Sequence, residues 1–592
     1  MDKRWHIAEP ISPEFRDKFP ELHPVAVQLL KNRGIETQEQ VDEFLLPDYG
    51  ENLYDPFLFR SMKTACQRVW QAIENGEKLA IFGDYDADGV TGTAILLTVF
   101  REVAELAGSD SELIVSYIPH REHEGYGMND EAVRKLADDN VRLIVTVDCG
   151  ISNAGEVKLA QDLGLDVIIT DHHQVPERVP DCTLIHPLAP GETYPNGSLA
   201  GAAVAFKFAS GFLSFAREQG LDIPLGREKW LLDLVAIATV TDFMKLVGEN
   251  RTLEKWGLVV LNKTQRPGLR KLIEAAGLEL GQLDTVSIGY YIGPRINAAS
   301  RMEHADLALQ TLLAKDEAEG IRLARQLNLC NADRQRSTEE VYRRALTMFE
   351  PDKKVQVIVG DGWSPGIVGI VAGKLVSQWG VPVFVLGRQP DGKVVGSGRS
   401  IPDFDVVGLL RHCQEFLSRF GGHPEACGLT LVGEENLTGF IYRAWEFADQ
   451  QLDGRDLRPM IRLDAELAAS QINWELINEL QRFEPFGIGN PKPLFLLRDL
   501  QLMNVTPVGK DGKHVRLSVR GDAPRETRLI AFGFAERMAE FVPTDRLDAV
   551  VELGINDWNG VRSIQIRLVD VRSSETAVEE QAKSIKKATQ KV

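Results

Sequence analysis

The side chains best suited to chemistry lie in residues 83–89, Gly-Asp-Tyr-Asp-Ala-Asp-Gly, directly after the apolar run 79–82. Three carboxylates so close together repel one another, and a divalent cation removes that repulsion. A solvated acidic turn is one alternative. A calcium loop of the EF-hand type is another, but its twelfth position, counted from Asp84, requires glutamate and is Ile95 here. The motif therefore predicts a metal site at the end of a buried strand.

Further metal-ligand side chains follow other apolar runs. The run 143–147 leads into Asp148, the run 166–170 leads into residues 171–173 (Asp-His-His), and an apolar helix ends just before Asp242. Because ligands of parallel sheets bind beyond the carboxyl ends of the strands, we expect these groups at one edge. Carboxylates with one or two imidazoles suit Mg²⁺ or Mn²⁺, and so many ligands predict two ions. Asp148, alone at its strand end, is the expected bridging ligand.

The elements that position these groups alternate between helix and strand. Helices are predicted over 63–75, 91–106, 131–138 and 153–163, and strands over 79–82, 113–117, 143–147 and 166–170. Uniformly apolar strands separated by amphipathic helices are typical of a parallel sheet that is covered on both faces.

The chain is too long for one core and predicts three or four domains. It has no apolar run of the ~20 residues that a membrane span needs, and its start has no signal-peptide pattern. Six scattered cysteines without a CxxC pair argue against structural zinc and disulfides, so we expect a reducing cytoplasm. The net charge of −19 speaks against non-specific nucleic-acid binding by the bulk surface.

The motifs, taken in order, resemble the DHH phosphoesterase superfamily and its RecJ-type single-strand exonuclease branch. They are GDYDADG (83–89), PHREHEGYG (119–127), VTVDCG (145–150), TDHH (170–173), SLAGAAVAF (198–206), TVTDF (239–243) and IGPRINAASRM (292–302). The resemblance implies that the metal ligands are Asp86, Asp88, Asp148, His172 and Asp242. It also implies catalytic support from Asp84 and from His173, which would contact the scissile phosphate. A packed histidine that orients its neighbour is the alternative for His173.

The same resemblance implies residues that bind the substrate. Arg121 would hold a phosphate, although an exposed arginine on a loop can also be a surface charge. Arg295 and Asn297, on a predicted GPRIN turn, would meet nucleic acid or else stabilise the turn. In the second lobe, three glycine-rich segments predicted as loops (362–375, 396–400 and 420–428) suit phosphate. From them, Ser397, Arg399, Gly422 and His423 would bind the backbone or a terminal phosphate.

We therefore predict an α/β multidomain protein with a parallel-sheet DHH catalytic lobe and a C-terminal OB-fold barrel. The expected parts are a helical lead-in (1–62), the DHH catalytic domain (63–270), a helical connector (271–350), the DHH-associated α/β domain (351–455), the OB-fold-like domain (456–572) and a disordered tail (573–592). Charges on the connector are expected to form a solvated face. Alternating runs at 514–519, 527–532, 547–553 and 561–569 predict the barrel strands. Its basic residues are Lys510, Lys513, His514, Arg516, Arg520, Arg525 and Arg528.

The predicted activity is two-metal hydrolysis of single-stranded DNA from the 5′ end, an end preference that only the resemblance implies. Single-stranded DNA is the expected partner, with single-strand-binding protein and a helicase as further partners that the resemblance suggests, and we expect a monomer. Two alternatives remain: a phosphoesterase for short oligonucleotides, cyclic dinucleotides or pyrophosphate, and a non-catalytic DNA-binding replication factor. The OB-fold argues against the first, because a small substrate needs no tether, and the intact ligand set argues against the second.

Overall fold

A computed structural model describes residues 3–509, 511–558 and 560–574, and its chain divides into two compact units. The larger unit comprises residues 53–244 and 252–457, and the smaller comprises 1–52, 245–251 and 458–592. Lys510, predicted among the basic residues of the barrel, and the tail residues 575–592, predicted to be disordered, lie outside the described residues. None of the described helices is long and apolar enough to cross a membrane.

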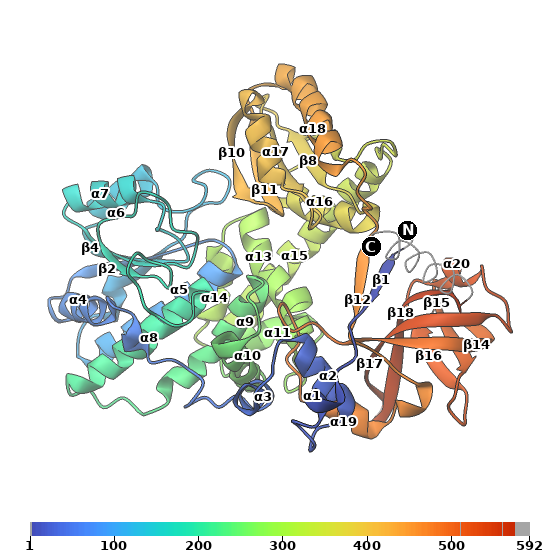
Figure 1. Ribbon diagram of the computed structural model, residues 1–592. Helices are drawn as coiled ribbons and strands as arrows, with labels where there is room; N and C mark the ends of the chain where they lie inside the picture. The colour runs from blue at the N-terminus through green and yellow to red at the C-terminus, as the bar shows by residue number, and fades with distance from the viewer. Residues whose placement is uncertain (1–2, 510, 559, 575–592) are drawn as a thin grey trace. The chain divides into compact units, whose positions relative to one another are not determined.

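The catalytic lobe is built on a five-stranded sheet in which all strands run parallel (Figure 1). In sheet order the strands are β3 (Ile114–Tyr117), β2 (Lys78–Gly83), β4 (Val141–Val147), β5 (Asp166–Thr170) and β6 (Thr183–Ile185). The helices packed on it are α4 (Met62–Glu74), α5 (Ala87–Leu106), α6 (Asp130–Asp138), α7 (Ala154–Asp162) and α8 (Gly201–Glu218). The predicted parallel sheet is thus confirmed.

The helix after the acidic motif begins earlier than the sequence predicts. It starts at Ala87, not at residue 91, because Asp86 is its N-cap. Gly89 therefore lies inside the first turn of α5 rather than in a turn before it. A Cβ at Gly89 would lie 2.5 Å from the Asp84 carbonyl oxygen, so glycine is needed for close packing against the strand end.

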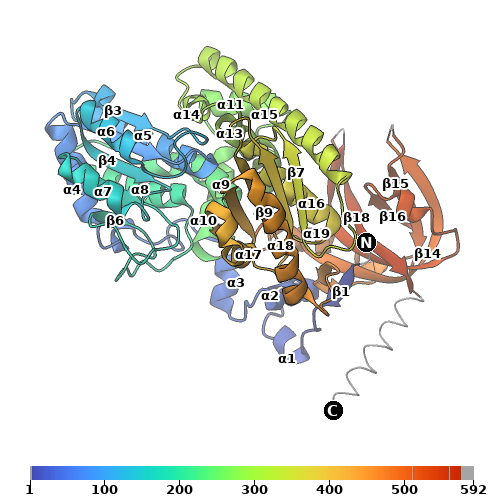
Figure 2. The same cartoon turned by 90° about the horizontal axis from the view of Figure 1, so that it is seen from above.

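A helical region follows the sheet. Its helices are α9 (Leu232–Thr241), α10 (Gly248–Leu261), α11 (Pro267–Ala275), α12 (Thr285–Ser287), α13 (Gly293–Met302), α14 (Asp306–Leu312) and α15 (Glu317–Leu346), with a π-helical turn η4 (Ile288–Ile292) before α13. The GPRIN segment is the start of α13, so the predicted turn is wrong: proline suits the first turn of a helix as well as a turn. The long α15 crosses the view in Figure 2. Ion pairs three or four residues apart on it fit the expected solvated face.

The second lobe carries a mixed sheet with helices on both faces. Its strands, in sheet order, are β10 (Leu417–His423), β11 (Ala426–Leu431), β9 (Val394–Arg399), β8 (Val383–Arg388) and β7 (Gln356–Asp361). Its helices are α16 (Pro365–Trp379), α17 (Val406–His412) and α18 (Leu437–Leu452).

The three glycine-rich segments of this lobe are not loops. Residues 362–375 fall mostly in α16, 396–400 in β9, and 420–428 in the β10–β11 hairpin. Glycine serves close packing in β9: a Cβ at Gly398 would lie 2.5 Å from the ring of Phe384.

The smaller unit is a β-barrel joined by the N-terminal segment. Its strands β14 (Leu494–Val508), β15 (His514–Arg520), β16 (Thr527–Ala531), β18 (Val561–Ser573) and β17 (Arg546–Trp558) follow one another, and β17 also pairs with β14, which closes the barrel. The short strands β12 (Met460–Leu463) and β13 (Ala465–Glu466) and the helices α19 (Trp474–Gln481) and α20 (Ala535–Met538) complete it. The sequence patterns missed β14, and β18 extends to Ser573, where a disordered tail was predicted.

The first residues of the chain pack with the barrel. The N-terminal elements are β1 (Arg4–Ile7), α1 (Pro13–Arg16), α2 (Pro24–Asn32) and α3 (Gln38–Leu45). Strand β1 pairs with β12 in parallel, and the helices share one hydrophobic core with α19 and the barrel strands. Nothing in the local sequence indicates this pairing, since it joins segments more than 450 residues apart.

Candidate metal centre

The three predicted strand ends meet in register at one edge of the catalytic sheet. The Asp84 amide donates to the Val147 carbonyl (3.1 Å), and the Asp148 amide donates to the Thr170 carbonyl (3.0 Å). The hydrogen-bonded ladder thus continues one residue beyond each strand and aligns Asp84, Asp148 and residues 171–173.

Seven predicted side chains converge there in three overlapping groups. Within each group the potential ligand atoms lie within 4.8 Å of one another, and the groups are Asp84, Asp86 and Asp148; Asp148, His172 and His173; and Asp88, His172 and Asp242. Because Asp148 and His172 each belong to two groups, the clusters are contiguous and form one polynuclear donor set.

Two helix N-termini hold the carboxylates of the acidic motif. One oxygen of Asp86 accepts from the amides of Asp88 (2.9 Å) and Gly89 (3.1 Å) at the start of α5. Asp88 uses both oxygens to accept from Gly201 and Ala202, each at 2.7 Å, at the start of α8. A Cβ at Gly201 would lie 2.6 Å from Cβ of Asp148, so only glycine lets α8 begin this close to the centre.

Four buried atoms at the centre have no hydrogen-bond partner among the described residues. They are Asp84 Oδ1, Asp148 Oδ1, His172 Nε2 and Asp242 Oδ2. His172 Nε2 lies 3.1 Å from Asp148 Oδ1 and 3.6 Å from Asp242 Oδ2, but without the alignment that a hydrogen bond needs. Buried polar atoms nearly always have a hydrogen-bond partner, so four converging atoms without one fit the binding of a cation. Carboxylate oxygens with one imidazole fit Mn²⁺ or Mg²⁺.

Burial and mutual repulsion disfavour ionised carboxylates at this centre. Burial, reinforced by the charge of Asp86, raises the pKa of Asp88 to about 7. Burial and the charges of Asp88 and Asp86 raise the pKa of Asp242 to about 8, and burial also raises the pKa values of Asp84 and Asp148 well above their usual range. Burial lowers the pKa of His172 to about 4, which keeps the imidazole neutral, as a metal ligand must be. A bound cation would reverse the cost of ionising the carboxylates.

The imidazole of His173 is hydrogen-bonded to Asp171, which the sequence placed among the metal-ligand side chains at the strand ends but which the resemblance did not name as a ligand. His173 Nδ1 lies 2.8 Å from Asp171 Oδ1, and the other oxygen of Asp171 accepts from the Ile151 amide (3.0 Å). Burial alone would lower the pKa of His173, but the hydrogen bond and charge of Asp171 outweigh it and raise that pKa to about 9. Nδ1–H donation to Asp171 leaves Nε2 as the free nitrogen. The signal in the sequence that could have indicated this role of Asp171 is its position directly before the histidine pair.

Tyr126 is a second residue that the sequence did not single out, although it lies within the quoted tract 119–127. Its hydroxyl donates to the Asp148 carbonyl (3.0 Å) and lies 3.1 Å from His173 Nδ1. The tyrosine therefore connects two strand ends of the centre.

Arginines gather beside the centre. Arg301 is held by the Gly366 carbonyl (2.7 Å), and burial, with the charges of Arg121, Arg334 and Arg399, lowers its pKa to about 9, while Asp86 opposes this shift. Arg121 lies over the ring of Tyr85 (4.7 Å to the centroid). These four arginines are called the arginine cluster below. The sequence predicted Arg121 and Arg399 but neither Arg301 nor Arg334.

The predicted substrate-binding residues of the second lobe lie in two places. Ser397 and Arg399 both border Gly369 of α16, where a Cβ would lie 3.3 Å from Ser397 Oγ and 3.0 Å from the Arg399 guanidinium. Gly422 and His423 are exposed at the end of β10, and the register His423–Ala426–Arg399 leads across the sheet.

Two predicted residues lie on α13. Arg295 donates to the Asn328 side chain (3.0 Å) and to the Tyr291 carbonyl (2.8 Å). Asn297 accepts from the Ala87 amide (2.8 Å), between the two aspartates Asp86 and Asp88. In this position Asn297 stabilises the backbone of the acidic motif.

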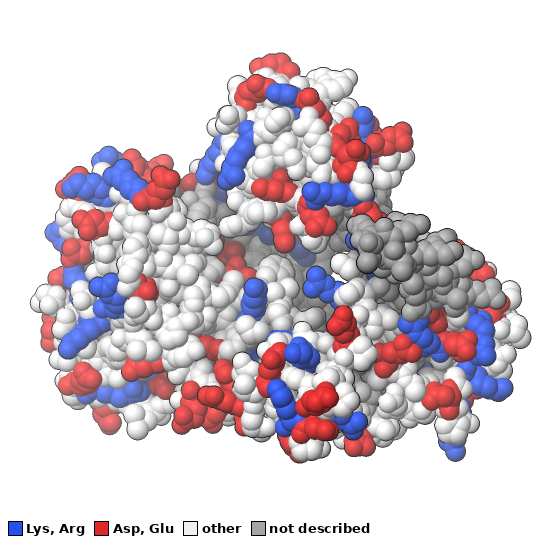
Figure 3. Space-filling view, viewed as in Figure 1, with Lys and Arg blue, Asp and Glu red and all other residues white. Residues whose placement is uncertain are grey.

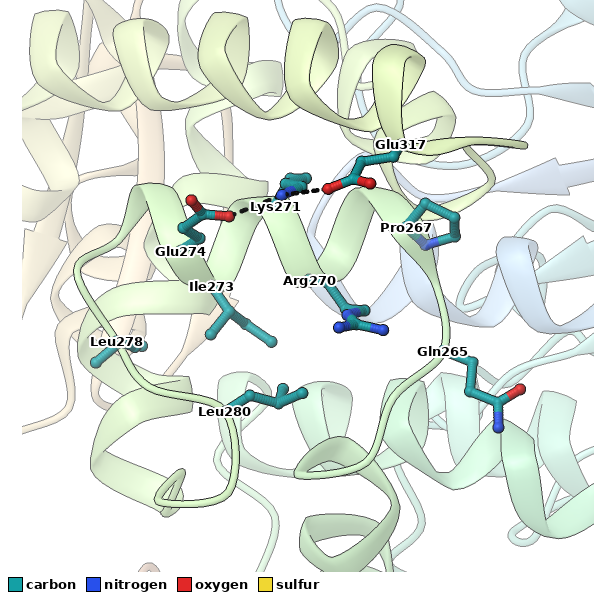
Figure 4. Close-up of a pocket in the computed structure, with 9 residues that line it drawn as sticks. All are labelled: Gln265, Pro267, Arg270, Lys271, Ile273, Glu274, Leu278, Leu280 and Glu317. Atoms are coloured by element: carbon teal, nitrogen blue, oxygen red, sulfur yellow. Dashed lines mark hydrogen bonds and ion pairs between the residues drawn. The ribbon is translucent and has the colours of Figure 1, made fainter.

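A separate cavity of about 440 Å³ borders α11 and contains none of the predicted site residues (Figure 4). Lys271 on its wall is paired with Glu274 (3.0 Å) and Glu317 (2.7 Å). The charge of Lys271 is thus balanced by two carboxylates.

Three family descriptions match the chain in order. Residues 78–239 match the DHH family, N-terminal domain, residues 352–450 match the DHHA1 domain, and residues 463–570 match the RecJ OB domain. The described fold agrees with this order of a parallel-sheet lobe, a mixed-sheet lobe and a barrel.

Similar proteins extend the match over nearly the whole chain. The chain is 37% identical to the single-stranded-DNA-specific exonuclease RecJ of Bacillus subtilis over 97% of this chain and 71% of that protein. It is 32% identical to RecJ of Thermus thermophilus over 97% of this chain and 79% of that protein. The crystal structure of Thermus thermophilus RecJ in complex with Mn²⁺ superposes with a TM-score of 0.81 at 30% identity, covering 96% of this chain and 79% of that one. The chain therefore belongs to the RecJ family of single-stranded-DNA-specific exonucleases.

Proposed function

We propose that this chain is a metal-dependent exonuclease that hydrolyses single-stranded DNA from its 5′ end. The observation that carries the proposal is the set of four convergent, buried and unsatisfied donor atoms at the sheet edge. Asp86, Asp88, Asp148, His172 and Asp242 would hold two Mn²⁺ or Mg²⁺ ions, with Asp148 shared between them. The Mn²⁺ and Mg²⁺ complexes of Thermus thermophilus RecJ support this choice of metal.

Different residues of the chain would have different roles in hydrolysis. When bound, two such ions activate a water molecule and neutralise charge on the leaving oxygen. His172 enters as a neutral ligand because burial holds its pKa at about 4. His173, kept protonated by Asp171, would donate from Nε2 to an oxygen of the scissile phosphate. Asp84 would support the ligand carboxylates from the strand end.

The arginine cluster supports the proposed end preference. Four like charges in a partly buried place cost free energy, which an anion would recover. A 5′-terminal phosphate bound by Arg121, Arg301 and Arg399 would place the next phosphodiester toward Asp86. Asp86 is close enough to Arg301 for its charge to act on the Arg301 pKa. Ser397, Gly422 and His423 would line the lobe on which Arg399 lies.

The barrel supports single-strand binding within its own unit. On the outer face of β15 and β16, Arg516 and Arg528 are exposed, and the exposed Phe532 lies edge-on to His514 (5.4 Å between centroids). Cations interleaved with aromatic rings suit single-stranded nucleic acid. On the surface visible in Figure 3, basic and acidic side chains are interspersed. A cytoplasmic monomer that works with a single-strand-binding protein and a helicase is part of this proposal.

The test is digestion with Mn²⁺ of single-stranded, double-stranded and dinucleotide substrates, each labelled at the 5′ or the 3′ end. We expect rapid loss of the 5′ label from single strands alone. Equal cleavage of all three substrates, or of the dinucleotide alone, would refute the proposal. Release of the 3′ label first would refute the end preference. Asp148→Ala should abolish activity while the protein remains folded.

A further inference from the structure

One exposed aromatic ring stands directly beside the metal centre. Phe243 follows the predicted ligand Asp242, and 73% of its surface is exposed. Its backbone adopts the left-handed region with φ of +56°, which is unfavourable for a bulky side chain. Such strain persists where the surrounding structure enforces it and is concentrated at functional sites.

A second exposed ring comes from the adjoining π-helical turn. In η4, Gly289 packs on Val240 and Tyr290 is 76% exposed. Four residues later a Cβ at Gly293 would lie 2.3 Å from the Thr241 side chain. The turn η4 therefore packs closely against the end of α9, which Phe243 follows, and we call this meeting of η4 with the end of α9 the aromatic junction. The turn η4 contacts both α9 and α13.

The helix α13 connects this junction to the arginine cluster. Near its start, Gly293 contacts Thr241. In the middle, Asn297 accepts from the Ala87 amide, which lies between Asp86 and Asp88. Near its end, Arg301 belongs to the arginine cluster. Residues 293, 297 and 301 share one helix face at a spacing of four. From Tyr290 to Arg301 the axis rises about 16 Å at ~1.5 Å per residue. The aromatic junction, the metal centre and the arginines thus follow one another along one element.

We propose that Phe243, together with Tyr290 of the adjoining turn η4, stacks on unpaired bases on the side of the metal centre away from the arginine cluster. The inference rests on the proposed exonuclease function, in which that side receives nucleotides 3′ of the cleaved bond. Every base offers a π-face, so a stacking platform holds a strand without reading its sequence. The platform would hold the scissile phosphate over the metals and disfavour paired bases, whose faces are already stacked.

The platform predicts a position-dependent need for a base. Oligonucleotides that each carry one abasic residue, at successive positions from the 5′ end, are digested with Mn²⁺ under single-turnover conditions. The unmodified protein should slow by about tenfold when the abasic residue occupies the platform position. Phe243→Leu should slow on every substrate by about the same factor and lose the position dependence. Phe243→Trp should retain it.

Two controls separate stacking from structure. Tyr442→Leu removes a ring that is 65% exposed on α18 and should leave rates and profile unchanged. Mn²⁺-dependent thermal stabilisation, measured on each variant, reports the neighbouring ligand Asp242. Wild-type rates and profile in Phe243→Leu would overturn the inference, and so would a defect that Phe243→Trp shares. No cleavage of any single strand by the unmodified protein would instead overturn the proposed function.

Discussion

Asp171 lies among the candidate metal ligands, and its carboxylate is hydrogen-bonded to a histidine and to backbone amides. Its carboxylate accepts from His173 Nδ1 and from backbone amides, and these hydrogen bonds outweigh burial and hold its pKa at about 2. It therefore stays ionised while the carboxylates next to it resist ionisation. That difference in hydrogen bonding distinguishes Asp171, as a residue that positions His173, from the candidate ligand carboxylates.

Asp171→Asn should lower kcat by about 10- to 100-fold with little change in KM, the usual cost of removing the residue that orients a functional histidine. The raised pKa of His173 should fall toward ~6.5, so activity should decline at a lower alkaline pH than in the unmodified protein. Steady-state rates across pH with Mn²⁺ check this. Asp162→Asn, at an exposed ion pair on α7, is the matched control. An unchanged alkaline limit would contradict the role given to Asp171.

The ligand carboxylates predict a pH-dependent response to metal. The pKa values of about 7 for Asp88 and about 8 for Asp242 lie above the ~3.9 of an unfolded aspartate. Their contribution to stability is therefore complete below about pH 4 and is lost as pH rises toward 8. Metal binding requires the ionised forms and recovers the loss. Mn²⁺ should raise Tm more at pH 8 than at pH 6 in thermal denaturation, and equal shifts would contradict this assignment.

At the scale of elements, the start of α8 determines how closely the centre can assemble. Its first amides bind both oxygens of Asp88, and Gly201 lies against Asp148. A helix N-terminus there also supplies partial positive charge to the carboxylate. The small residues of the SLAGAA segment thus serve the packing of the helix against the strand ends.

Gly201→Ala should push α8 away from Asp148 and weaken Mn²⁺ binding by at least about tenfold, with a stability loss of about 1–3 kcal/mol from overpacking. Gly155→Ala is the control, since a Cβ there meets nothing within 4 Å in the helix α7. Calorimetric Mn²⁺ titration and chemical denaturation measure the two effects. Wild-type Mn²⁺ affinity in Gly201→Ala would show that the contact does not control the centre.

At the scale of the whole molecule, a buried arginine joins three distant segments of the smaller unit. Arg251 is 1% exposed and donates to the carbonyls of Phe44, Phe483, Glu484 and Pro485. Its guanidinium also lies 3.9 Å from the Phe44 ring centroid. Burial, with the charge of Arg33, lowers its pKa to about 9.

Arg251→Ala should destabilise the protein by about 3 kcal/mol, because several buried carbonyls lose their donor at once. Arg178→Ala, at an exposed loop position, should be neutral. Urea denaturation followed by tryptophan fluorescence compares the two. A loss below about 1 kcal/mol for Arg251→Ala would mean that water replaces the lost hydrogen bonds.

The sequence by itself determined the parallel sheet and most of the side chains that converge at its edge. Apolar runs that end in Asp84, Asp148 and Asp171 place polar groups at strand ends, and in a parallel sheet those ends share an edge. An apolar helix that ends just before Asp242 added this residue from a helix terminus. Local periodicity and short motifs suffice for such features, because they depend on neighbours in the chain.

Only the tertiary structure decided the tasks of individual groups and the composition of the smaller unit. Asp88 and Asp171 are both acidic, yet Asp88 accepts from the first amides of α8 and Asp171 accepts from the Ile151 amide, and only the fold brings these donors to them. Gly398 and Gly366, which were predicted to lie in loops, lie in β9 and α16, where close packing and not turning favours glycine. The pairing of β1 with β12 and the burial of Arg251 involve partners hundreds of residues away. No local pattern carries that information, since long-range contacts are selected by the free energy of the whole fold.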